Sequence, residues 1–134
     1  MSREKLYSSK HVDIEYDVEG RFIYANWKGF QTVDNVKSGC YNMLELLKEK
    51  QCTKVLNDNR QVTGPWQEAA EWGAKEWFPA MFAAGLTRFA WIQSASVFSQ
   101  LSAEKTLSGT DKSQTNEAVR SFDDVEVARK WLVK

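Results

Sequence analysis

The sequence predicts an α/β fold: a mixed five-stranded sheet with helices packed against it. Three observations carry this prediction. The chain has 134 residues, a length that suits one domain with a substantial core. Two segments with alternating apolar residues, 11–17 and 22–27, flank a turn at Glu19-Gly20, and this pattern is typical of an antiparallel hairpin. After the hairpin, segments with helical spacing alternate with short apolar segments, which indicates parallel strands joined by helices.

The first half of the chain is expected to supply the hairpin, one helix and one buried strand. Beyond residue 32, apolar residues recur at intervals of three and four, and Thr32 can cap this helix at its N-terminus. The apolar residues near position 55 do not alternate with polar ones, as in a strand that is buried on both faces. The predicted elements are strands at 11–17 and 22–27, a helix from 33 to about 47, and a strand at 53–57.

The second half is expected to hold three helices and two strands, giving the element order ββαβαβαβα. Pro65 suits the first turn of a helix, because the amide hydrogen that proline lacks has no helical partner there. Pro79 lies inside the same helical pattern and should kink the helix or split it. Ser96 can cap the next helix, and Asp123, with Glu126 three residues later, can cap the last one. The predicted elements are a helix from 65 to about 85, a strand at 88–93, a helix after 96, a mobile polar loop at 108–117, a strand at 118–122 and a closing helix.

The charge balance excludes several classes of function. Lys and Arg together number 18, as do Asp and Glu, so the formal net charge is zero. A nucleic-acid-binding protein concentrates positive charge on one face, and attraction to anionic membranes needs a polybasic segment. The first residues contain no apolar run typical of a signal peptide, and no stretch approaches the roughly 18 apolar residues of a membrane span. We therefore expect a cytoplasmic protein that binds no nucleic acid and inserts into no membrane.

Few residues of this chain suit a metal site or a catalytic pair. His11 is the only histidine, and the cysteines Cys40 and Cys52 do not form a CxxC pair. The chain therefore has too few histidines for a metal site built on them and offers only one histidine for a Cys–His pair. We interpret both cysteines as small packed hydrophobic residues, and we expect neither a metal nor a cofactor.

A polar cluster, Asp58, Asn59 and Arg60, follows the third predicted strand. Beside a helix N-terminus these side chains can bind a carboxylate or a phosphate. Equally, an Asp–Arg pair can satisfy the polar groups at the end of a buried strand. Catalysis would also need a nucleophile and an oriented base, and the chain has neither a Gly-x-Ser-x-Gly motif nor a glycine-rich phosphate loop. A hydrolase or a transferase is therefore a remote alternative.

The chain contains six tryptophans, a residue type that is enriched at interfaces. On a regular helix, a rotation of about 100° per residue places Trp66 and Trp77 toward the sheet and Trp72 well away from it. Phe78 and Phe82 flank the sheet-facing sector. Together with Trp72 they can form an exposed apolar surface or line a pocket, features that mark interfaces and ligand grooves. Cover of Trp72 by the loop near residue 109 is a third alternative.

Five short motifs, in this order and spacing, resemble the STAS domains, the anti-sigma-factor antagonist or SpoIIAA-like family. They are WKGF after the second strand, DNR at the end of the third, EWFP in the second long helix, GLTRFAWI entering the fourth strand, and SFDDVEVARKWL at the C-terminus. The resemblance covers about residues 10–133 of a single domain spanning 1–134. It looks like the small stand-alone branch that is grouped with CRAL-TRIO-like lipid binders.

The resemblance implies a non-enzymatic bacterial regulatory domain that acts by binding a protein partner. In STAS antagonists, a partner kinase phosphorylates a serine or threonine at the start of the second long helix, and this switches docking. Thr63 stands at the matching place, although Thr-Gly replaces the usual Ser-Ser-Gly-like turn. The alternative is that Thr63 caps the helix. We expect the docking face at 57–66 and the start of the following helix, with the residues Asp58, Asn59, Arg60, Thr63 and Trp66.

A second function stays open: a carrier of a small apolar ligand such as a lipid. The aromatic residues along 66–82 and the CRAL-TRIO-like grouping favour it, and it needs an enclosed cavity of about 300 Å³ or more. A weak homodimer through 72–82 is also predicted, because Trp72, Phe78 and Phe82 would each forgo about 2 kcal/mol if they stayed in water. Zero net charge removes the long-range repulsion between copies.

Overall fold

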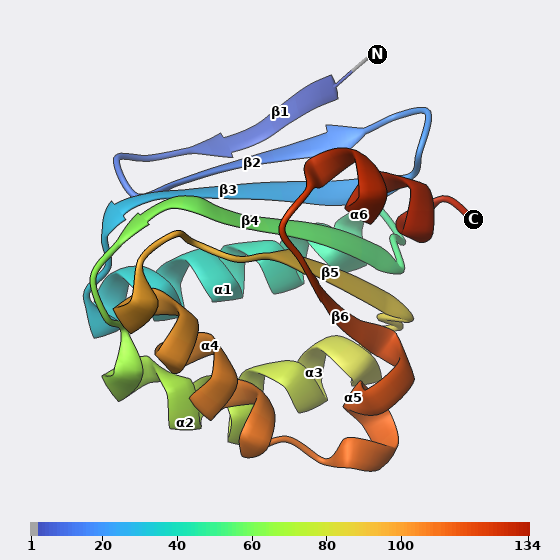
Figure 1. The fold of residues 1–134 in the computed structure, drawn as a ribbon. Helices are drawn as coiled ribbons and strands as arrows, with labels where there is room; N and C mark the ends of the chain where they lie inside the picture. The colour runs from blue at the N-terminus through green and yellow to red at the C-terminus, as the bar shows by residue number, and fades with distance from the viewer. Residues whose placement is uncertain (1–2) are drawn as a thin grey trace.

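One mixed sheet of six strands organises the structure, a computed structural model that describes residues 3–134 (Figure 1). The strands are β1 (Arg3–Ser8), β2 (Val12–Asp17), β3 (Phe22–Phe30), β4 (Lys54–Thr63), β5 (Arg88–Ile92) and β6 (Val119–Phe122). They lie side by side in chain order. The pairs β1–β2 and β2–β3 are antiparallel, whereas β3, β4, β5 and β6 run parallel. The predicted α/β class, with an antiparallel N-terminal hairpin and parallel later strands, is confirmed.

The sheet has one strand more than the five that were predicted. The additional strand, β1, pairs with β2 from Arg3↔Asp17 to Ser8↔Asp13 and lies at the edge of the sheet. Its side chains are all exposed or half-buried. A strand without a buried face shows no apolar alternation, and the alternation was the signal used to find strands.

Strand β4 is twice as long as predicted, because it continues through the polar cluster to Thr63. The side chains of Asn57, Asp58 and Asn59 are buried, which a cluster of polar residues does not suggest. The pairing with β3 shifts between Asn26↔Asp58 and Lys28↔Gln61, so β4 carries an extra residue here. Such bulges are over-represented next to functional sites.

Helix α1 (Val33–Glu49) covers the first half of the sheet and begins as predicted. The Thr32 hydroxyl accepts a hydrogen bond from the Asn35 amide at 3.1 Å. On the buried side of the helix, Gly39 faces the indole ring of Trp27. A β-carbon on Gly39 would lie 2.4 Å from the Cη2 atom of Trp27, so the glycine gives this ring its room.

The segment after β4 was expected to be a regular helix from Pro65 that Pro79 kinks or splits; the segment is divided, but it is not a regular helix. Four short helical pieces follow one another: η1 (Gln67–Ala69, a 3-10 turn), α2 (Ala70–Trp72), η2 (Gly73–Trp77, a π-helical turn) and α3 (Phe78–Ala83). Proline clashes with the carbonyl four residues before it, and the wider π-helical turn directly before Pro79 relieves this clash. Because 3-10 and π turns change the rotation per residue, the projection that turned Trp72 outward fails, and Trp72 is buried.

The C-terminal third also departs from the prediction in two places. Helix α4 (Val97–Ser108) begins at its expected cap, Ser96. The expected loop at 108–117 contains helix α5 (Lys112–Ala118), which the Asp111 carboxylate caps by accepting from the Ser113 amide at 3.0 Å. The cap of α6 (Val125–Leu132) is Asp124, one residue after the predicted Asp123. Polar composition concealed α5, since only Thr115 of its side chains is buried.

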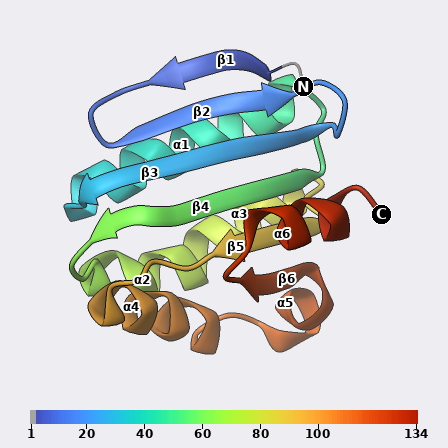
Figure 2. The same cartoon turned by 45° about the horizontal axis from the view of Figure 1, so that its top comes forward.

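The helices form two unequal layers. In Figures 1 and 2, α1, α2, α3 and α4 lie on one face of the sheet and α6 lies on the other, across β4 and β5. The larger apolar core lies under the first group. The smaller core joins α6 to the sheet and consists of Phe22, Leu56, Ala90, Ile92, Ala128 and Leu132.

The contact between Gly39 and Trp27 predicts that Gly39→Ala destabilises the protein by about 1–3 kcal/mol, although alanine favours helix by about 1 kcal/mol. Urea unfolding measures the difference. Gly73→Ala is the matched control, because a β-carbon there would meet Thr106 Cγ2 at an ordinary 3.4 Å. We expect the control to lose no stability; equal losses in both variants would contradict the assigned contact.

Candidate functional site

The alternation of β4 divides the predicted polar cluster between the two faces of the sheet. The side chains of Asn57 and Asn59 lie on the face covered by α1 and the 66–83 segment, where the Asn57 Nδ2 amide donates to Asn59 Oδ1 at 3.2 Å. Asp58 lies on the opposite face and pairs there with Arg60. The residues expected to form one docking surface therefore belong to two separate environments.

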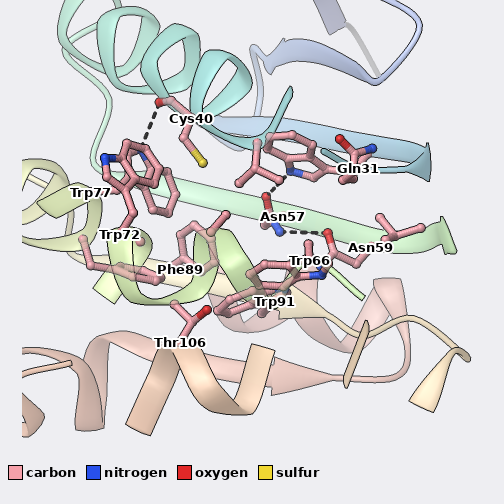
Figure 3. A pocket seen from close by; sticks show the side chains of 16 residues that line it. Gln31, Cys40, Asn57, Asn59, Trp66, Trp72, Trp77, Phe89, Trp91 and Thr106 are labelled. Atoms are coloured by element: carbon pink, nitrogen blue, oxygen red, sulfur yellow. Dashed lines mark hydrogen bonds between the residues drawn. The ribbon is translucent and has the colours of Figure 1, made fainter. Parts of the chain in front are cut away.

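A pocket lies on the first of these faces, between the sheet, α1, the 66–78 segment and α4 (Figure 3). Five of the six tryptophans line it, and no charged side chain is among its lining residues. Its free volume is about 50 Å³. We call it the tryptophan pocket; its walls include Trp27, Trp66, Trp72, Trp77, Phe78, Phe89 and Trp91, with Gln31, Asn57, Asn59 and Thr106 as polar members.

Hydrogen bonds hold three of the five indole rings. Trp27 Nε1 donates to Asn57 Oδ1 at 2.8 Å, Trp77 Nε1 to the Cys40 carbonyl at 2.9 Å, and Trp66 Nε1 to Ser99 Oγ at 3.2 Å. The Trp91 ring stacks on that of Trp66, with centroids 6.0 Å apart and an angle of 24° between the planes. The walls are therefore preorganised by specific partners and not by apolar contact alone.

Two polar atoms of the lining residues are buried without a hydrogen-bond partner among residues 3–134. They are Trp91 Nε1 and Gln31 Oε1. The amide nitrogen of Gln31, in contrast, donates to the carbonyls of His11 and Lys28 at 3.1 and 2.9 Å. A buried unpaired donor or acceptor costs about 1–3 kcal/mol, so these atoms mark the pocket as a place where stability is not the whole requirement.

On the opposite face, Asp58 is buried and its charge is compensated. The Arg60 guanidinium donates from Nε to Oδ1 at 3.0 Å and from Nη2 to Oδ2 at 2.7 Å, and the Tyr24 hydroxyl donates to Oδ2 at 2.6 Å. Burial would raise the pKa of Asp58, but the hydrogen bonds from Arg60 and Tyr24 outweigh it and hold the pKa below the ordinary value of 3.8. Burial, followed by the contact with Asp58, raises the pKa of Tyr24 to about 12. All three groups thus keep one protonation state near neutral pH.

The other predicted site residues fall in three places. Trp66, Trp72 and Phe78 line the tryptophan pocket. Phe82 lies outside it, half-buried and stacked on Phe78 at 6.3 Å. Thr63 is exposed at the end of β4 and caps no helix, because the first helical turn begins at Gln67 and has no side-chain cap.

The premise of the predicted dimer is wrong, because the aromatic rings along 72–82 are not left in water. Trp72 and Phe78 are buried within the chain, with relative exposures of 9% and 1%. The Tyr41 ring covers Trp72 edge-on at 5.3 Å between ring centroids. Only Phe82, which is half-buried, therefore still supports a dimer formed through exposed rings, and the dimer itself stays a prediction.

Sequence reasoning missed that Trp27, Trp91 and Asn57 belong to one site. Parallel pairing places Asn57 beside Ala25 on β3 and beside Trp91 on β5, and Trp27 lies two residues after Ala25 on the same face. The register of parallel strands carries this information, and a single sequence does not fix that register.

Within residues 3–134, no group of three or more His, Cys, Asp and Glu side chains is close enough to hold a metal ion. Burial raises the pKa of the thiols of Cys40 and Cys52, so both are poor ligands and poor nucleophiles. This agrees with their interpretation as packed residues.

Comparison with known proteins does not place the chain in a family: no family model, curated protein or solved structure matches it. None of the helices between residues 3 and 134 is both long enough and apolar enough to cross a membrane. The site must therefore be interpreted from its own chemistry.

The Asp58–Arg60 pair predicts a specific dependence of stability on pH. A carboxylate with a lowered pKa contributes stability at pH 7, and this contribution is lost as the pH falls through the lowered pKa. Arg60→Met should cost about 1–3 kcal/mol at pH 7; the guanidinium is half-exposed, so solvent screening keeps the cost below that of a fully buried pair. Without Arg60, burial raises the pKa of Asp58. The deficit should therefore shrink as the pH approaches 4, and urea unfolding at both pH values measures it; an equal deficit at both would contradict the ion pair's role.

Proposed function

We propose that this chain is a binding domain that performs no chemistry of its own and holds a small, uncharged, mainly aromatic or apolar ligand in the tryptophan pocket. The observation that carries the proposal is the gathering of five of the six tryptophans around one uncharged pocket. Pockets lined by aromatic side chains with a few polar groups are the usual form of small-molecule sites.

The lining chemistry supports an uncharged ligand. A charged ligand would leave water for walls that contain no opposite charge, and this transfer is unfavourable unless the charge is paired. The unpaired atoms of Trp91 and Gln31 offer neutral hydrogen bonds instead. Catalysis has no comparable support, since the buried carboxylate of Asp58 is on the other face and already neutralised by Arg60.

The volume of the pocket limits the size of the ligand. About 50 Å³ accommodates a few ordered waters, so even a single aromatic ring requires a side chain of the wall to move, whereas sites for larger ligands enclose about 300 Å³ or more. A lipid, the larger apolar ligand that the CRAL-TRIO-like resemblance suggests, would require a wall of the pocket to move. A carrier of a lipid would therefore use the same pocket, in a widened form.

Three compounds with the same ring and different charge test the proposal: phenol, benzoate and benzylamine. Saturation-transfer NMR and calorimetry should show binding of phenol at least about tenfold tighter than that of either ion, because only the ions lose hydration without a partner. Trp91→Ala should abolish phenol binding, and Trp131→Ala, on the opposite face, should retain it. Binding without regard to charge, or binding that survives Trp91→Ala, would contradict the proposal.

A second candidate is the STAS-like function, docking of a regulatory protein partner. It is favoured by the outer side of α4, where Val97, Phe98 and Leu101 have relative exposures of 63%, 61% and 47%. A row of exposed apolar side chains marks an interaction surface. The test is a pull-down from the native host with wild type and Phe98→Ser: the partner should be lost from the variant, and identical partner sets would exclude docking through α4. Thr63, exposed at the end of β4, stays the candidate phosphosite of this function.

A further inference from the structure

We propose that Trp66 is a movable plug of the tryptophan pocket, and that the ligand is a planar, uncharged aromatic molecule with a hydrogen-bond donor that takes the place of the Trp66 indole. This inference rests on the binding function proposed above and specifies both the ligand class and the way the site opens. With the Trp66 ring in place, the free volume of about 50 Å³ is too small for an aromatic ligand. Removal of an indole ring from the pocket would provide the missing space.

The position of Trp66 in the chain makes it the movable wall. The other four tryptophans of the pocket belong to strands or to helical turns, whereas Trp66 precedes the first turn and has a non-helical backbone, with φ −137° and ψ 35°. It follows Gly64, whose φ of +75° favours glycine, and Pro65, which is exposed. The Trp66 side chain is itself only half-buried. Its ring can therefore leave the pocket without the loss of a helix or a strand.

The contacts of the Trp66 ring define what its place accepts. The ring stacks on Trp91, and its Nε1–H donates to Ser99 Oγ at 3.2 Å. The backbone amide of Trp66 donates to Ser102 Oγ at 3.0 Å. A planar ring with one N–H or O–H donor reproduces both contacts of the indole: the aromatic face against Trp91 and the hydrogen bond to Ser99.

Helix α4 provides the hydroxyl groups that contact Trp66, those of Ser99 and Ser102; we call these two residues the seat. It does so by burying small polar side chains where a helix usually buries large apolar ones. Its buried positions are Ser99, Ser102, Ala103 and Thr106. Val97, Phe98 and Leu101 are exposed, and Leu107 alone of its large apolar side chains packs, partly buried, against the core. A buried hydroxyl requires a partner, so Ser99 would be left unsatisfied if the Trp66 ring moved out and nothing replaced its donor. The seat therefore favours a ligand with a donor over a plain hydrocarbon.

Indole is the probe that tests the displacement directly. In ¹⁵N-labelled wild type, with the indole N–H signals assigned through Trp66→Phe and Trp77→Phe, addition of unlabelled indole should shift the Trp66 signal. The Trp77 signal should stay, because its partner is the Cys40 carbonyl and not the seat on α4. Binding of indole, or of phenol, with an unmoved Trp66 signal would overturn the plug and leave the proposed binding function intact. No binding of either compound to wild type or to Trp66→Ala would overturn both.

Affinities separate a plug from a cavity that any apolar molecule fills. Trp66→Ala should bind indole at least about tenfold more tightly than wild type. In wild type the open state is populated at only about 0.1–10%, and the apparent dissociation constant rises by the inverse of that fraction, whereas the variant is always open. Adding Ser99→Ala to Trp66→Ala should weaken indole binding severalfold and leave naphthalene, which has no donor, unchanged. Trp131→Ala is the matched control and should gain no affinity. An equal response of indole and naphthalene to Ser99→Ala would overturn the assigned ligand class.

Discussion

The hydrogen bond from Trp27 Nε1 to Asn57 Oδ1, 2.8 Å long, ties the two central parallel strands together inside the larger core. Consecutive side chains of β4 alternate between the two faces of the sheet, so Asn57 faces Trp27 while Asp58 points to the other face. The amide nitrogen of Asn57 then reaches Asn59, the next residue on the same face. Because of this alternation, Asn57 and Asn59 form part of one wall of the tryptophan pocket, and Asp58 between them pairs with Arg60 on the opposite face of the sheet. A shift of β4 by one residue would exchange the two environments and leave neither satisfied.

What could be predicted from the sequence was local. The helix caps at Thr32 and Ser96 depend on neighbours within three residues, and both are where the pattern placed them. The class of the fold followed from the order of local patterns. One prediction failed where distant contacts override local preference: the polar residues of β4 are buried because neighbouring strands and helices enclose them. Helix α5 was missed for another reason, because its mainly polar sequence lacks an apolar pattern although Asp111 caps it locally.

The candidate site was predictable only in part, for the same reason. Trp72 and Phe78 could be named because they share a segment with Trp66, and a pocket was among the alternatives. Their direction could not be obtained from a regular helical projection, because a 3-10 turn and a π turn interrupt the segment. Trp91 comes from a strand that is distant in sequence and meets Asn57 only through the register of β4 and β5. The pocket is thus a product of tertiary pairing.

The tryptophan pocket combines features that do not favour stability with features that favour recognition. Trp91 and Gln31 retain unpaired buried atoms, and α4 buries hydroxyls while it exposes Phe98 and its apolar neighbours. Each choice forgoes about 1–3 kcal/mol that a fully apolar or fully bonded arrangement would supply. Departures from good packing that gather at one place are expected at functional sites. Two of the six unpaired buried side-chain atoms within residues 3–134 belong to residues that line this pocket, and so does the buried hydroxyl of Thr106 on α4.

The central claim is that recognition occurs in the tryptophan pocket and not at the charged pair on the other face. A crystallographic soak with a mixed set of neutral, anionic and cationic aromatic fragments tests it most directly, because it reports the place and the charge class together. We expect neutral fragments against the Trp91 ring, within the walls formed by α1, the sheet and α4. Fragments gathered around Arg60 and Asp58, with the tryptophan pocket unchanged, would contradict it.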